Sequence, residues 1–105
     1  MANAITPNLL VQGNSGTDAT SYTTAATPTL VSGTVVTAWV ATLISAGTPN
    51  TPTCTGTNGL NGTWTAITNV VQDQINITMF RSTTPSTTAG TLTFDAAGGG
   101  AGTDL

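Results

Sequence analysis

Five charged residues are the whole ionic inventory of this 105-residue chain: Arg81 and the four aspartates Asp18, Asp73, Asp95 and Asp104. The chain contains no His, Lys or Glu. General acid–base catalysis ordinarily draws on His, Lys or a carboxylate with a tuned pKa. Ser and Thr hydroxyls are abundant, but a nucleophilic hydroxyl needs a neighbouring base to activate it. The inventory therefore argues against an enzyme and favours a structural or surface-binding role.

Metal and cofactor chemistry is equally poorly supplied. The turn at residues 14–18 offers oxygen atoms to Ca²⁺, but it has a single carboxylate, whereas the tighter calcium sites carry several. Cys54 is the one cysteine, and zinc sites need further Cys or His ligands. We expect Cys54 to be a small buried hydrophobic side chain in a strand, the alternative being an intermolecular disulfide. No catalytic, metal or cofactor site is expected.

The charge balance bounds the partners. With a net charge of −3 and one Arg, the chain cannot neutralise several phosphates or an anionic membrane surface. Residues 1–10 have neither the basic start nor the apolar centre of a secretory signal. The most apolar stretch, Val35–Ile44, is about half the length of a membrane-spanning helix. We expect no binding of nucleic acid or membrane, and a soluble protein made without an export signal, unless a precursor segment has been removed.

The residue types favour extended backbone throughout. Thr fills about a quarter of all positions, far above ordinary usage, and Thr, Val and Ile prefer strands. Gly, Pro, Asn and Ser interrupt the chain at short intervals, as turns do in all-β proteins. Six or seven short strands are expected, in segments 21–25, 34–44, 53–55, 63–71, 75–80 and 91–95, with residues 9–12 as either a short first strand or an arm. The predicted fold is an all-β antiparallel β-sandwich, jelly-roll-like, complete in itself or completed by a neighbouring subunit.

The alternation of residues in several strands predicts which way their side chains point. Residues 34–44 carry apolar side chains on both faces, which predicts a central strand covered on both sides. Residues 63–71 and 75–80 flank a tight connection and are expected to form a hairpin. Ile75, Ile77 and Met79 then share one face of its second strand, with Phe80 on the other. In the last strand Leu92 and Phe94 are expected to point inward.

The tryptophans and the arginine have two interpretations each. Trp39 and Trp64 could stack on sugar rings, but both lie in alternating apolar patterns, so packing in the core is the better account. Arg81 either forms an interface ion pair, with Asp73, Asp95 or an aspartate of a neighbouring subunit, or is a solvated strand end. An exposed pair contributes only about 0–1 kcal/mol, so the sequence leaves both interpretations open.

The chain divides into three parts. Residues 1–20 are expected to form an N-terminal arm and turn, residues 21–95 the sandwich, and residues 96–105 a Gly-rich tail that is flexible unless a partner orders it. The arm is the predicted grip on a neighbouring subunit, through four apolar side chains that, with Arg81, are the candidate interface residues: Ile5, Leu9, Leu10 and Val11.

Four segments in order resemble a group of phage and prophage virion-associated β-sandwich proteins. They are the apolar strand TVVTAWVATLI, the turn-containing NGLNGTWTAI, the strand end MFRS and the closing STTAGTLTFD. Together they span a little over half the chain. Such domains usually continue into further strands, whereas here the sequence runs into GGGAGTDL. That departure implies a shorter domain, strands supplied by a neighbour, or a fragment.

The resemblance implies a jelly-roll-like sandwich on a particle surface, such as a capsid decoration (cement) protein or a fibre component, with no catalytic residues. The expected function is therefore a non-enzymatic virion structural protein that binds the outer capsid through an arm and strand pairing. Its partners would be the major capsid protein or other virion proteins, and it would form a homo-oligomer. The alternatives are a carbohydrate-binding surface module and a self-assembling extracellular filament subunit.

Overall fold

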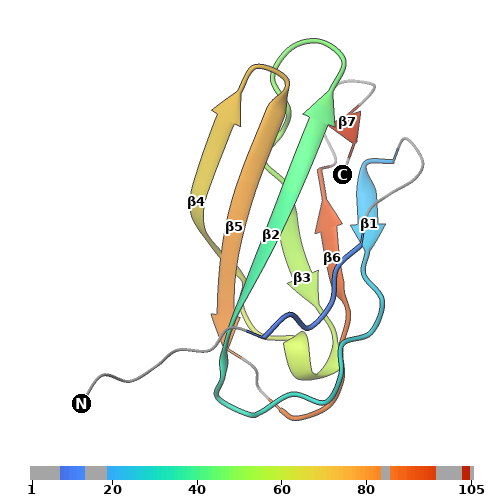
Figure 1. Ribbon diagram of the computed structural model, residues 1–105, viewed down its shortest axis with the longest axis vertical. Coiled ribbons are helices and arrows are strands. Elements are labelled where there is room, and N and C mark those ends of the chain that lie inside the picture. The colour runs from blue at the N-terminus through green and yellow to red at the C-terminus, as the bar shows by residue number, and fades with distance from the viewer. Residues whose placement is uncertain (1–7, 14–18, 84–85, 97–102, 105) are drawn as a thin grey trace.

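Two antiparallel sheets pack face to face in the computed structural model, which describes residues 8–13, 19–83, 86–96 and 103–104 (Figure 1). The three-stranded sheet has the order β1 (Ser21–Thr23), β6 (Leu92–Asp95), β3 (Thr53–Gly56). The four-stranded sheet has the order β4 (Thr65–Gln72), β5 (Ile75–Thr83), β2 (Val35–Ile44), β7 (Thr103–Asp104). A 3-10 turn, η1 (Asn58–Leu60), precedes β4. The prediction of an all-β antiparallel sandwich is confirmed.

The predicted hairpin is also confirmed, as β4 and β5. Gln72 pairs with Ile75, which leaves a two-residue loop whose first residue, Asp73, has a φ of 53°. Tight hairpin loops require this left-handed conformation at that position, and Asp tolerates it better than most residues. The ladder shifts register between Ala66 and Thr68, so Ile67 is an extra residue in a β-bulge. The bulge interrupts the hydrogen-bonding edge that β4 presents to solvent.

The apolar core fills one half of the sandwich. Phe80 of β5 and Phe94 of β6 contact each other across the two sheets, with ring centroids 6.2 Å apart and planes tilted by 41°. Such tilted aromatic pairs are favourable beyond the area that they bury. The remaining buried members of this cluster are Leu30, Val36, Ala38, Leu60 and Leu92. Leu92 and Phe94 therefore point inward, as predicted.

Close backbone packing closes the base of this core. Leu60, at the end of η1, is 1% exposed, and its carbonyl accepts a 2.9 Å hydrogen bond from Nε1 of Trp64. Gly59 lies so near the backbone of Thr88 that a Cβ atom at this position would collide with the Thr88 carbonyl oxygen. The turn therefore depends on a residue without a side chain at position 59.

The other half of the sandwich has a polar interior. Thr42, Asn76 and Thr78 point inward from β2 and β5 and are completely buried. The Thr78 hydroxyl donates to Oδ1 of Asn69 at 2.8 Å, and the Asn76 amide donates to the Thr51 hydroxyl at 3.3 Å. Since these groups have hydrogen-bond partners, their burial does not carry the full cost of desolvation.

The C-terminal residues that the structure describes contact the sandwich. The Ala96 amide donates to the Thr20 carbonyl at 2.8 Å, and Ala96 is buried. Thr103–Asp104 forms β7 and pairs with Leu43 and Ile44 at the edge of the four-stranded sheet. These two residues belong to the segment expected to form a flexible tail, and in the structure they extend the edge of the sheet next to β2.

Candidate functional site

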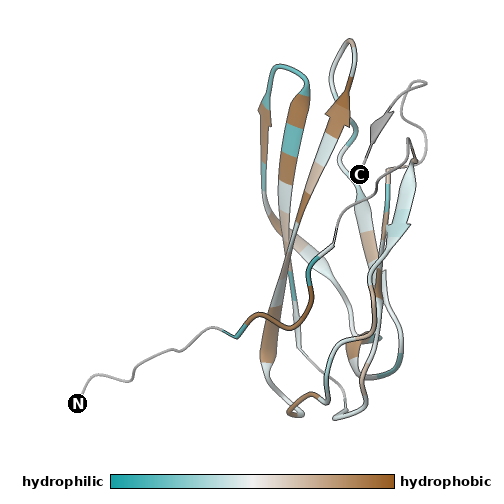
Figure 2. Cartoon of the chain, turned by 45° about the vertical axis from the view of Figure 1, so that its right-hand side comes forward, coloured by the Kyte–Doolittle hydropathy of each residue, from teal (hydrophilic) through white to brown (hydrophobic). Residues whose placement is uncertain are grey.

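The solvent-facing side of β4, β5 and β2 is apolar. Strand alternation places residues on opposite faces of a sheet, and here the odd-numbered residues of β2 and β5 point outward. Figure 2 shows hydrophobic bands along these strands, in brown. We use the name outer face for the apolar side chains on this side: Trp39, Ala41, Leu43, Val70, Ile75, Ile77 and Met79.

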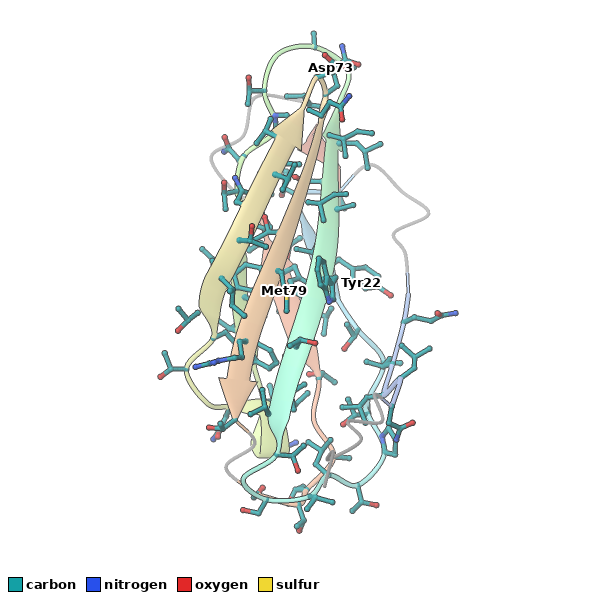
Figure 3. The ribbon with its side chains drawn as sticks, turned by 60° about the vertical axis from the view of Figure 1, so that its left-hand side comes forward. Tyr22, Asp73 and Met79 are labelled. Carbon is teal, nitrogen blue, oxygen red and sulfur yellow. The ribbon has the colours of Figure 1, made fainter. Side chains whose placement is uncertain are left out.

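The register gathers these side chains into cross-strand rows. Trp39 pairs with Met79, and Leu43 pairs with Ile75. Between them, Ala41, Ile77 and Val70 form a row that crosses all three strands. Met79 points away from the sandwich at mid-strand, on the side seen in Figure 3. Directly paired side chains lie about 4.5–5.5 Å apart at their Cβ atoms, so the outer face is one continuous surface.

The polarity of this region is reversed relative to an ordinary sandwich. Asn76 is 0% exposed on the inner face, whereas its neighbour Ile77 is 43% exposed on the outer face. Antiparallel sheets with one covered face normally place polar residues toward water. Contiguous exposed apolar surface is the kind of feature that proteins use for contacts with other proteins, membranes or ligands.

Two expectations from the sequence are corrected here. Residues 34–44 were expected to form a strand covered on both sides, but the outer side of β2 has no covering layer among the described residues. Trp39 was expected in the core and is instead 63% exposed. The physical reason is that β2 carries apolar side chains on both faces, and the second sheet covers only one of them.

Two charges of opposite sign bracket the outer face. Arg81 is exposed on the same side of β5, in register with Thr37 and Thr65. Asp73 lies at the tip of the hairpin (Figure 3). It borders a hollow that Ile75, Ile77 and Val70 also line. Arg81 lies on β5 of the four-stranded sheet, whereas Asp95 lies on β6 of the other sheet and Asp73 in the loop at the far end of the hairpin, so the structure does not bring these residues together.

The predicted arm is placed only in part. Ile5 lies outside the described residues. Leu9 is 72% exposed, whereas Leu10 is half-buried and packs against the core cluster, and Val11 is also half-buried. Gly13 lies against the Tyr22 ring on β1. The segment 8–13 therefore contacts its own sandwich, and Leu9 is its outward apolar side chain.

The remaining candidates give no site. Cys54 is half-buried against the core, and desolvation raises the pKa of its thiol to about 12. Thiolate is the reactive form of cysteine, so this thiol is chemically inert near neutral pH. No cluster of three metal-binding side chains occurs among the residues that the structure describes. The calcium turn at residues 14–18 lies outside them.

Comparison of this chain with protein-family models, with curated proteins and with solved structures finds no match. None of the described elements is a helix with the length and hydrophobicity required to cross a membrane.

The outer face is the feature that sequence reasoning missed. Its signal was present in β5, where apolar residues 75, 77 and 79 alternate with Asn76 and Thr78, and with Phe80 on the polar side.

Proposed function

We propose that this protein is a non-enzymatic structural subunit that acts by burying its outer face against protein. One observation carries the proposal: apolar side chains face solvent on β4, β5 and β2 while polar side chains are buried behind them. A surface of this composition loses water favourably on association, at about 25 cal/mol for each Å² of apolar area.

The assembly that we propose is a phage virion, with this protein as a capsid decoration subunit on the outer surface. The support is the resemblance of four ordered sequence segments to virion-associated β-sandwich proteins. The shortage of charge agrees with it, because apolar and hydroxyl contacts are screened by salt much less than ion pairs are. Leu9, exposed at the N-terminal segment, would supply the contact with the major capsid protein.

Co-sedimentation tests the virion proposal. Purified protein is mixed with capsids that lack decoration subunits, at low and at high salt, and the pelleted fraction is measured. We expect saturable binding that changes little between 50 mM and 500 mM NaCl. Absence of binding to capsids that do bind their own decoration protein would overturn the virion assignment.

Trp39 favours a second candidate, a carbohydrate-binding module. Trp39 is 63% exposed on the outer face, and an exposed indole ring can stack on a sugar ring. Titration with a glycan panel, monitored by tryptophan fluorescence, distinguishes the two functions. Sugar binding predicts saturable quenching that Trp39→Ala removes and Trp64→Phe preserves, because Trp64 is half-buried and hydrogen-bonded to Leu60.

A further inference from the structure

We propose that the occupant of the outer face is a second copy of this chain, packed face to face about a two-fold axis that crosses β5 at Ile77. This inference rests on the proposed function, in which the outer face binds protein, and it names the partner. The axis lies in the interface and runs perpendicular to the strands, so the β5 strands of the two copies are antiparallel.

Charge complementarity selects this arrangement. Asp73 and Arg81 lie four residues before and four residues after Ile77 on the same hairpin. Asp73 lies in the loop at one end of β5 and Arg81 toward the other end of the strand, so the two-fold axis through Ile77 brings Arg81 of one copy to the end of the outer face that Asp73 of the other copy borders, twice in each dimer. An axis parallel to the strands would instead place Arg81 over Arg81. Like charges across an interface are unfavourable, whereas opposite charges fix its register.

Shape complementarity follows from the same operation. The row of Trp39 and Met79 in one copy comes to lie over the row of Leu43 and Ile75 in the other. The small Ala41 sits at the axis beside Ile77, where each copy faces its own equivalent. Packed sheets lie about 10 Å apart, and a small residue at the axis leaves room for the two Trp39 rings on either side.

The area sets the strength of this dimer. Eight residue steps of about 3.3 Å along β5 and three strands about 4.8 Å apart give a footprint of about 26 Å by 15 Å. Two such faces bury roughly 1,000 Å² in total once side-chain relief is counted, the lower end of specific interfaces. We therefore expect a reversible dimer with a Kd of about 1–100 μM rather than an obligate one.

Sedimentation equilibrium from 1 to 500 μM tests dimerisation without any capsid present. We expect the wild type to pass from monomer to dimer, and Ile77→Lys to remain monomeric because it brings two ammonium groups together at the axis. The matched control is Thr55→Lys on the exposed side of β3, which adds the same charge to the other sheet and keeps the wild-type Kd. Far-UV circular dichroism confirms that both variants are folded. A wild type that stays monomeric at 500 μM, or an Ile77→Lys variant that dimerises like it, overturns the proposal.

The charge pairing has its own test. Arg81→Gln and Asp73→Asn should each weaken dimerisation about 3- to 10-fold, and the double variant should weaken it no further, because each change breaks the same two pairs. Asn at position 73 tolerates the positive φ of that residue. Additive effects, or none, would overturn the antiparallel arrangement.

Cross-linking fixes the position of the axis. In a Cys54→Ser background, Ile77→Cys should cross-link efficiently with a bismaleimide of about 10 Å reach, since the two sheets are separated by about that distance. Ile75→Cys should cross-link poorly, because the reversal moves its two copies about 13 Å apart along the strands. Equal yields would overturn the position of the axis.

The dimer and the virion assignment fail separately. A dimer that does not bind capsids would support this inference and overturn the virion assignment, whereas a monomer that binds capsids would support the virion assignment and overturn this inference.

Discussion

Asn76 and Ile77 are consecutive residues of β5 whose exposures are the reverse of their polarities: the amide is 0% exposed and the isoleucine is 43% exposed. The orientations of these two side chains are coupled by strand alternation, because turning Ile77 inward would turn Asn76 outward. The hydrogen bonds of Asn76 with Thr51 and of Thr78 with Asn69 stabilise the observed choice from within. The same choice leaves the outer face for a partner.

Removing the buried amide should destabilise the monomer. Asn76→Ala is expected to lower the free energy of unfolding by about 1–3 kcal/mol, since it removes a completely buried amide that donates to the Thr51 hydroxyl and accepts from the Thr78 hydroxyl. Urea denaturation at low protein concentration measures this. The control is Thr55→Val, which replaces an exposed hydroxyl on β3 by a methyl group with little change in side-chain shape. Its free energy of unfolding should stay within about 0.5 kcal/mol of that of the wild type. Equal stability of Asn76→Ala and wild type would mean that the polar interior contributes nothing.

The adjacent leucines of the N-terminal segment should behave differently. Leu10→Ala is expected to cost about 1–2 kcal/mol of stability, because Leu10 packs against the core cluster. Leu9→Ala should leave stability unchanged and weaken binding to capsids, because Leu9 is exposed. Thermal unfolding and capsid co-sedimentation of the two variants measure this contrast. A stability loss in Leu9→Ala similar to that in Leu10→Ala would place both side chains in the fold and neither in an interface.

The Cys54 thiol should make the protein less stable in alkali. The folded protein holds the thiol proton up to a pKa of about 12, whereas an ordinary thiol releases it near 9.0. Between these values the unfolded chain has lost a proton that the folded chain keeps, so stability falls as pH rises through this window. Cys54→Ala should remove this part of the decline.

Thiol reactivity provides an independent check on Cys54. At pH 8 the folded protein should react slowly with a maleimide, and the rate should rise to that of an ordinary cysteine in denaturing urea. Fast labelling of the folded protein would show that the thiol is not desolvated.

The turn beneath the core should reject a methyl group at position 59. Gly59→Ala drives Cβ into the Thr88 carbonyl, so the backbone must move, and we expect a loss of more than about 2 kcal/mol. Gly33→Ala is the comparison: Gly33 has a φ of 76° and open space around it, so only backbone strain of about 1 kcal/mol is expected. Chemical denaturation ranks the two variants, and the reverse order would contradict the close packing of η1.

The sequence predicts the strands well because turn-forming residues mark where they begin and end. Turn residues bound each apolar run, and the positive φ that a two-residue loop requires falls on Asp73. The side of the sheet that the second sheet covers is harder to predict. In β2 the two faces are almost equally apolar, so Trp39 looks like a core residue when its strand is read alone. The face of β2 that is covered follows only from its pairing with β5. Phe80 and three polar residues of β5 lie on the inner side, which places the opposite side, with Trp39, toward solvent.

β7 could not be predicted for a different reason. Two residues in a Gly-rich segment carry no periodicity, and their pairing with Leu43 and Ile44 is a tertiary contact. Arg81 and Asp73 were recognised as candidates for an ion pair from charge alone. Their positions beyond opposite sides of Ile77 acquire meaning only when Arg81 is placed on the outer side of β5 and Asp73 in the loop at the other end of that strand.

The bulge at Ile67 has a consequence for the order of folding. The β4–β5 hairpin closes a two-residue loop and is expected to form within microseconds, whereas β1 and β6 join residues 70 positions apart, as Thr23 and Thr93 are. Long-range pairing of this kind is slow. The hairpin therefore forms before β1 and β6 pair, and until then its apolar side and its uncharged edge are exposed to solvent. An interrupted edge is a poor template for another chain. Straightening it by deletion of Ile67 should therefore reduce the yield of refolding at high concentration more than it reduces the equilibrium stability of the monomer.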